Sequence, residues 1–140
     1  MLNELQRLHA LILVSLEQLD ELTVHARPPM DRLPAVRLAL TRASRARTLL
    51  LKHKYDQLIL LAPAQQKAGI EALKVEGAAN LAISTQHIGA WTLREIAARW
   101  PDYCAASGAM RSAMRKTVQK EAALIYPLLS ISPGRSAAWG

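Results

Sequence analysis

Apolar residues recur every three or four positions through most of the chain, a spacing typical of one face of an α-helix. This pattern predicts an amphipathic helix over residues 2–25. Its apolar face consists of Leu2, Leu5, Leu8, Ile12, Leu16 and Leu19. Pro28 and Pro29 end this helix, because proline lacks an amide hydrogen and disfavours helical geometry in the residue before it.

Three further segments carry the same helical pattern. A second helix is predicted between Asp31, a suitable N-cap, and Pro63, with Pro34 tolerated in its first turn. A third begins at about residue 64 or 68 and ends at 90. The last helix is predicted over residues 102–127, with Asp102 as its cap and Pro127 at its end.

A capping box interrupts the chain between the third and last long helices. Thr92 is followed three residues later by Glu95 and preceded by the apolar Trp91, the arrangement in which the two polar side chains cap each other's backbone amides. It predicts a short helix over residues 93–99.

These elements predict an all-α fold, namely an up-and-down antiparallel four-helix bundle with a short extra helix between helices three and four. The 140 residues include 51% hydrophobic residues and no Phe, so aliphatic side chains build the core. We expect one domain over residues 1–130 and a flexible C-terminal tail over residues 131–140, which is rich in Ser, Gly and Pro.

The net charge of +7 raises the question of a nucleic-acid partner. The distribution of the charges argues against one, because the basic residues of the second helix are scattered over more than half of its circumference. No aromatic side chains alternate with them as a stacking surface would need. The basic residues concerned are Arg37, Arg42, Arg45, Arg47, Lys52 and Lys54.

Cysteine usage and hydropathy indicate the compartment. Cys104 is alone, so the chain forms no internal disulfide. No run of 18 apolar residues occurs without charge, so no membrane span is expected. Glu4, Arg7 and His9 interrupt the apolar pattern of the N-terminus, which therefore does not resemble a signal peptide. We expect a cytoplasmic protein; a protein partner and a homodimer both stay open.

The chain also contains a faint internal repeat. Residues 53–63 and 117–127 both end in proline and align without gaps. Each half of the chain is then one helical hairpin. The polar residues that align are His53 with Thr117 and Gln57 with Glu121.

The second copy of this repeat carries a recognisable motif. Glu121, followed by apolar residues and Tyr126-Pro127-Leu128, resembles the end of the fourth helix in hemerythrin-like (HHE cation-binding) domains. His53 before Pro63 is similar to the equivalent helix end in the first half, and Leu8-His9 to the histidine early in helix one. The resemblance spans roughly residues 5–130 and implies a di-iron centre held by histidines and bridging carboxylates.

The resemblance implies the metal ligands His9, His53, Gln57, Glu76 and Glu121. The chain has only four histidines, and His25 lies beside the paired prolines at the far end of helix one, so we exclude it. The spacing of the repeat places the third-helix ligand near Glu76, whereas His87 lies three helical turns further along. Gln57 and Thr117 stand where the family pattern has a carboxylate and a histidine.

An incomplete ligand set of this kind favours at most one iron or other divalent metal ion, or a metal-free polar cluster in the same place. We therefore expect a sensor or regulatory module and not an oxygen carrier. A metal-free helical protein-interaction module and a non-haem iron protein with oxygen or peroxide chemistry are the alternatives. No Walker loop, nucleophile elbow or Cys-x-x-Cys pair occurs, so the sequence gives no separate indication of an enzyme.

Overall fold

A computed structural model describes residues 1–130, which form six α-helices and no strand. The all-α prediction is confirmed for this part of the chain. The expected tail over residues 131–140 lies outside the described residues. The helices are α1 (Leu2–Leu22), α2 (Leu33–Lys52), α3 (Tyr55–Leu61), α4 (Ala64–Ala90), α5 (Leu93–Ala98) and α6 (Trp100–Ser130).

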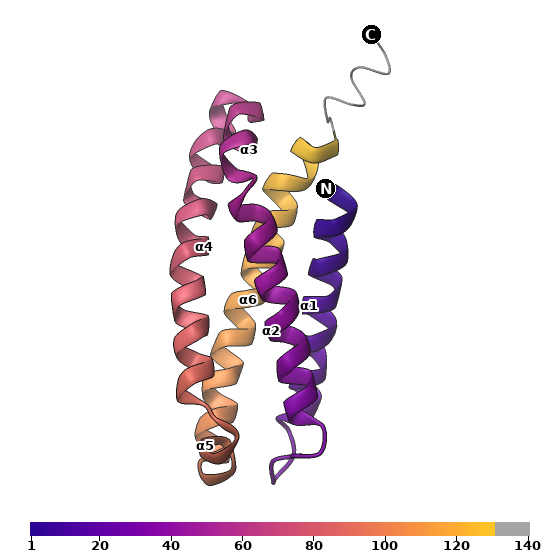
Figure 1. The fold of residues 1–140 in the computed structure, drawn as a ribbon, viewed down its shortest axis with the longest axis vertical. Helices are drawn as coiled ribbons and strands as arrows, with labels where there is room; N and C mark the ends of the chain where they lie inside the picture. Colours follow the sequence, from indigo (N-terminus) through magenta and orange to yellow (C-terminus); the bar gives the residue numbers. More distant parts are fainter. Residues whose placement is uncertain (131–140) are drawn as a thin grey trace.

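The long helices α1, α2, α4 and α6 run side by side, and successive ones point in opposite directions (Figure 1). α1 packs against α2 and α6, while α4 packs against α3, α6 and α2. The short helices lie at opposite ends, α3 at the upper end of Figure 1 and α5 at the lower end. Within the described residues, no helix combines the length and apolarity that a membrane crossing requires.

The predicted second helix is interrupted, which corrects the expectation of one helix up to Pro63. α2 ends at Lys52 and α3 begins at Tyr55. Between them the amide of Lys54 donates to the carbonyl of Leu51 at 2.9 Å, three residues back instead of four. This tighter turn interrupts the helix at His53. The sequence has no glycine or proline at this point that would have predicted the interruption.

The capping box is confirmed, because the amide of Glu95 donates to Oγ1 of Thr92 at 3.2 Å and α5 begins directly after it. The predicted limits of the last helix are wrong at both ends. α6 begins at Trp100 and continues through Pro127 to Ser130. Pro101 lies in the first turn of α6, where backbone amides have no helical acceptor, so its missing amide hydrogen costs no hydrogen bond. At the other end, continuing past Pro127 buries Leu128, which is only 3% exposed.

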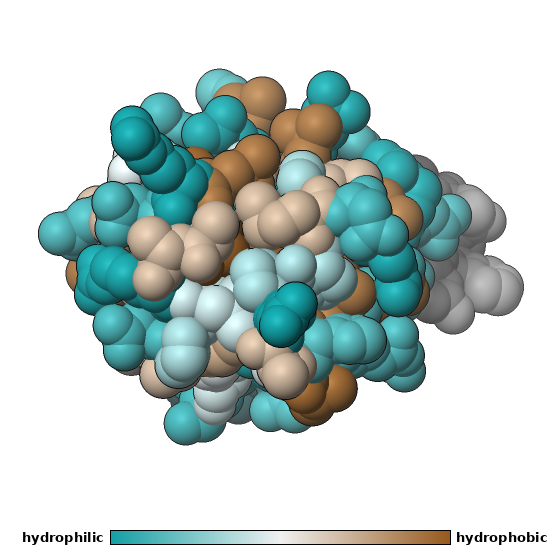
Figure 2. Space-filling view, turned by 90° about the horizontal axis from the view of Figure 1, so that it is seen from below, coloured by the Kyte–Doolittle hydropathy of each residue, from teal (hydrophilic) through white to brown (hydrophobic). Residues whose placement is uncertain are grey.

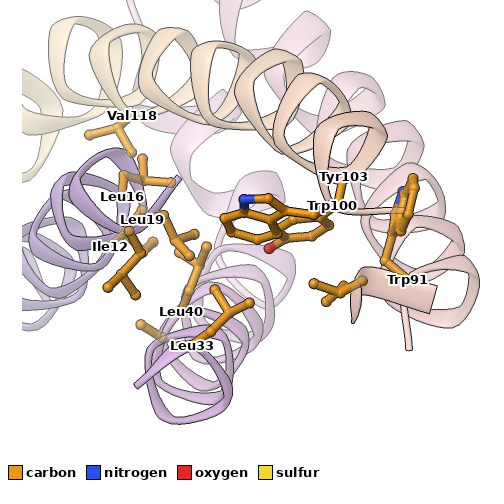
Figure 3. Packing of buried hydrophobic residues seen from close by; sticks show 12 residues of the cluster. Ile12, Leu16, Leu19, Leu33, Leu40, Trp91, Trp100, Tyr103 and Val118 are labelled. Carbon is orange, nitrogen blue, oxygen red and sulfur yellow. The ribbon is translucent and has the colours of Figure 1, made fainter. Parts of the chain in front are cut away.

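The core consists of two separate apolar clusters. The lower cluster lies toward the lower end of the molecule and is formed by residues of α1, α2, α5 and α6. It includes the aromatic side chains of Trp91, Trp100 and Tyr103 (Figure 3). The rings of Trp100 and Tyr103 stack with centroids 5.7 Å apart. The upper cluster lies around α3 and includes Tyr55 and Ile125. On the surface of the lower end, apolar and polar residues are intermixed (Figure 2).

Candidate functional site in a buried polar layer

A layer of polar residues separates the two apolar clusters. On each of α1, α2 and α6, one buried polar residue lies between a residue of the upper cluster and a residue of the lower cluster. The spacings of three or four residues keep all three members of each triplet on one helix face. The triplets are Leu5–His9–Ile12, Leu51–Arg47–Ala43 and Ile125–Glu121–Val118.

Glu121 is the centre of this layer and is 1% exposed. Its Oε1 lies 2.8 Å from Nε2 of His9, and its Oε2 accepts a hydrogen bond from Nη1 of Arg47. Nδ1 of His9 lies 2.5 Å from the hydroxyl oxygen of Tyr126. We call these four residues the polar cluster. They come from three helices, so the cluster connects α1, α2 and α6 across the core.

Within the polar cluster, each ring nitrogen of His9 and each carboxylate oxygen of Glu121 has a hydrogen-bonding partner from the cluster itself. An ionised carboxylate only accepts hydrogen bonds, so Nε2 of His9 carries the proton that Glu121 accepts. When the ring carries only this one proton, Nδ1 is an acceptor and receives the hydroxyl hydrogen of Tyr126. Arg47 supplies the positive charge that a buried carboxylate requires.

Two tyrosines respond to the buried charge of Glu121. Burial, assisted by that charge and only partly opposed by Arg47, raises the pKa of Tyr55 to about 12. Burial and the same carboxylate also raise the pKa of Tyr126. Both phenols therefore keep their protons at neutral pH, and Tyr126 stays a hydrogen-bond donor to His9.

The structure brings together two of the five predicted ligands, His9 and Glu121. His53 is exposed in the turn after α2, and Gln57 is exposed on α3. Glu76, on α4, is partly exposed, and its Oε2 lies 3.5 Å from Nζ of Lys120. The interruption at His53 explains much of this difference, since an unbroken helix is what the implied ligand spacing assumed.

As they lie, the residues of the layer do not fit a metal ion. Both ring nitrogens of His9 and both carboxylate oxygens of Glu121 already have protein partners. Over residues 1–130, no group of three or more His, Cys, Asp or Glu side chains is placed to hold a metal ion. The guanidinium of Arg47 already neutralises the carboxylate of Glu121.

Sequence reasoning missed Arg47, which it counted among scattered surface charges. Its burial had a signal, because Arg47 lies four residues before Leu51 and seven after Leu40, on the apolar face of its helix. Thr117, which stands where the family pattern has a histidine, lies outside the polar cluster. Its Oγ1 donates to the carbonyl of Ala113 at 3.1 Å and lies 3.4 Å from Nδ2 of Asn80.

A second set of ion pairs joins α1 to α6 nearer the lower end. The carboxylate of Asp20 accepts hydrogen bonds from both Arg111 and Arg115. Burial raises the pKa of Asp20, but the bonds and charges of Arg115 and Arg111 outweigh this effect and hold the pKa below its usual value. This set contains one carboxylate and two cations, which suits a structural link between helices.

Comparison of the chain with models of protein families, with curated proteins and with solved structures finds no match. The hemerythrin-like resemblance therefore rests on the sequence motifs alone.

Proposed function

We propose that the chain is a hemerythrin-like, up-and-down four-helix bundle in which an internal ion pair takes the place of a metal centre. It works as a non-enzymatic regulatory or interaction module. The observation that carries this proposal is the pairing of Arg47 with the carboxylate of Glu121, beside His9.

The reasoning starts from charge. A buried carboxylate between helices is costly unless a cation neutralises it, and in a metal-binding bundle the metal does so. Here the guanidinium of Arg47 does so, with hydrogen bonds that a guanidinium forms well. The polar cluster then has a structural task, which is to fix the register of α1, α2 and α6. The pairing of its donors and acceptors supports a binding role for the chain over an enzymatic one.

The alternative with one metal ion has one supporting feature. His9 and Glu121 meet although they are 112 residues apart in the sequence, and imidazole with carboxylate is a suitable pair of ligands for iron. A metal ion held by Nε2 of His9 and Oε1 of Glu121 would have to replace the hydrogen bond between these two atoms, so the two proposals differ in what they expect of that bond.

Elemental analysis of untagged protein separates them. The protein is prepared without chelators, incubated anaerobically with ferrous iron and passed over a desalting column. We expect no stoichiometric iron in the wild-type protein. The proposal is overturned if the protein keeps one or more equivalents of iron and the His9→Gln variant loses them. His53→Gln, at an exposed position, is the matched control.

A further inference from the structure

A pocket of about 120 Å³ opens between α2, α4 and α6, on the side of the molecule away from most of α1. It exists because α4 is closely packed only in its first half. Ile70 and Leu73 are the buried residues of this helix, and no residue of α4 after Leu73 is buried. The second half of α4 therefore forms one wall of a pocket instead of closing on α2.

The inner surface of the pocket is apolar. Ile12 reaches it from α1, and Met110, Met114 and Val118 line it from α6. An engineered apolar cavity of about 150 Å³ binds benzene, so the space here suits a group of roughly that size. Methionine side chains also adapt readily to the shape of an apolar guest.

The pocket also has a polar side, and its charged lining residues are both positive. Hydroxyl side chains such as Thr41, Ser44 and Ser84 line it, together with Arg45 and Arg47. No Asp or Glu is among the lining residues. Arg47 is engaged by Glu121, whereas Arg45 is exposed and forms no ion pair with another residue of the described part of the chain. The charge of Arg45 thus favours a ligand with one negative charge.

We propose that this pocket binds a small amphiphilic monocarboxylate, with its apolar body against Met110 and Met114 and its carboxylate at Arg45. The inference deepens the proposed function by naming the ligand class of the module. The pocket borders the polar cluster at Arg47, but Arg45, Met110 and Met114, which we expect to contact the ligand, lie outside the cluster, so the two proposals can fail separately.

Titration with benzoate, followed by NMR of protein labelled at its methionine methyl groups, tests this inference. The chain has four methionines, and Met110 and Met114 line the pocket whereas Met1 and Met30 do not. We expect saturable shifts of the first two signals and none of the others. Benzyl alcohol, a neutral molecule of similar size, should bind at least about fivefold more weakly, because it lacks the charge that Arg45 pairs with.

Three variants show whether binding depends on the charge of Arg45 or on the volume of the pocket. Arg45→Gln should weaken benzoate binding about fivefold and leave benzyl alcohol unchanged. Ala113→Leu, at an exposed position on the pocket wall, should weaken both molecules by filling the space. Arg42→Gln removes an exposed charge of the same helix that does not line the pocket, and it should change neither.

Any of three results would overturn the inference: no saturable shift at Met110 and Met114, equal binding of the two probes, or equal effects of Arg45→Gln and Arg42→Gln. All titrations are made in the presence of a chelator. A metal found by elemental analysis would then contradict the proposed function without bearing on this pocket.

Discussion

Arg47 on α2 and Glu121 on α6 form a buried ion pair between residues 74 positions apart in the sequence. Their side chains are 9% and 1% exposed, so water screens neither charge well. His9 from α1 binds the other oxygen of the same carboxylate. Together, His9, Arg47 and Glu121 fix α1, α2 and α6 relative to one another between the two apolar clusters.

Replacing Arg47 with Met should destabilise the protein by about 3–5 kcal/mol, because it leaves a carboxylate buried without its cation. The free energy of unfolding from urea denaturation measures the loss. Arg45→Met, at an exposed position of the same helix, should stay within about 0.5 kcal/mol of the wild type.

A second substitution separates loss of charge pairing from loss of packing. In the double variant Arg47→Met with Glu121→Gln, no buried charge is left, and the amide oxygen still accepts from His9. We expect it to recover more than half of the stability that Arg47→Met loses. A double variant as unstable as the sum of both single variants would mean that Arg47 acts through packing and not through its charge.

The hydroxyl of Tyr126 should contribute about 1–2 kcal/mol, because Tyr126→Phe leaves Nδ1 of buried His9 without a donor. Urea denaturation measures this loss as well. Tyr103→Phe is the comparison, because it removes a buried hydroxyl of the lower cluster that interacts with Ser107 and not with His9; it should leave exchange in the upper halves of α1 and α6 unchanged. Equal hydrogen-exchange protection of the upper halves of α1 and α6 in Tyr126→Phe and wild type would contradict the assigned role.

The sequence predicted the helices better than the site, for a physical reason. Periodic apolar positions are a local signal, and so is the Thr92–Glu95 capping box, which the structure confirms. The interruption at His53 has no such signal, since neither Gly nor Pro stands between α2 and α3. Burial of Arg47 depends on a carboxylate from another helix. The local pattern places Arg47 on the apolar face of its helix but does not show which residue neutralises it.

Acid should weaken the link between α1 and α6. The pKa of Asp20 is held below its usual value of 3.8 in the folded protein, so its ion pairs contribute stability above pH 3.8 that is lost as the pH falls further. We expect Asp20→Asn to be less stable than the wild type at pH 7 and to lose less stability between pH 4 and pH 2. Denaturation curves at a series of pH values measure both, and parallel pH profiles would contradict the prediction.

Alkali should destabilise the protein in part through Tyr55. Its pKa is about 12 in the folded state and about 10 when the chain is unfolded, so the unfolded state releases this proton first. Stability should therefore fall between pH 10 and pH 12, by roughly 2 kcal/mol in total. Tyr55→Phe should remove this contribution to the loss of stability. In an ultraviolet titration, the variant should lack one phenol that loses its proton near pH 12.

The last prediction tests whether His53 is exposed, as the structure has it, or buried, as a metal ligand would be. If His53 lies in the turn between α2 and α3, His53→Ala should change the free energy of unfolding by no more than about 0.5 kcal/mol. His9→Ala should cost about 2–4 kcal/mol, since it leaves Glu121 and Tyr126 each without a partner and opens a cavity. A loss of about 2–4 kcal/mol in His53→Ala, as large as that expected for His9→Ala, would contradict the exposed position of His53.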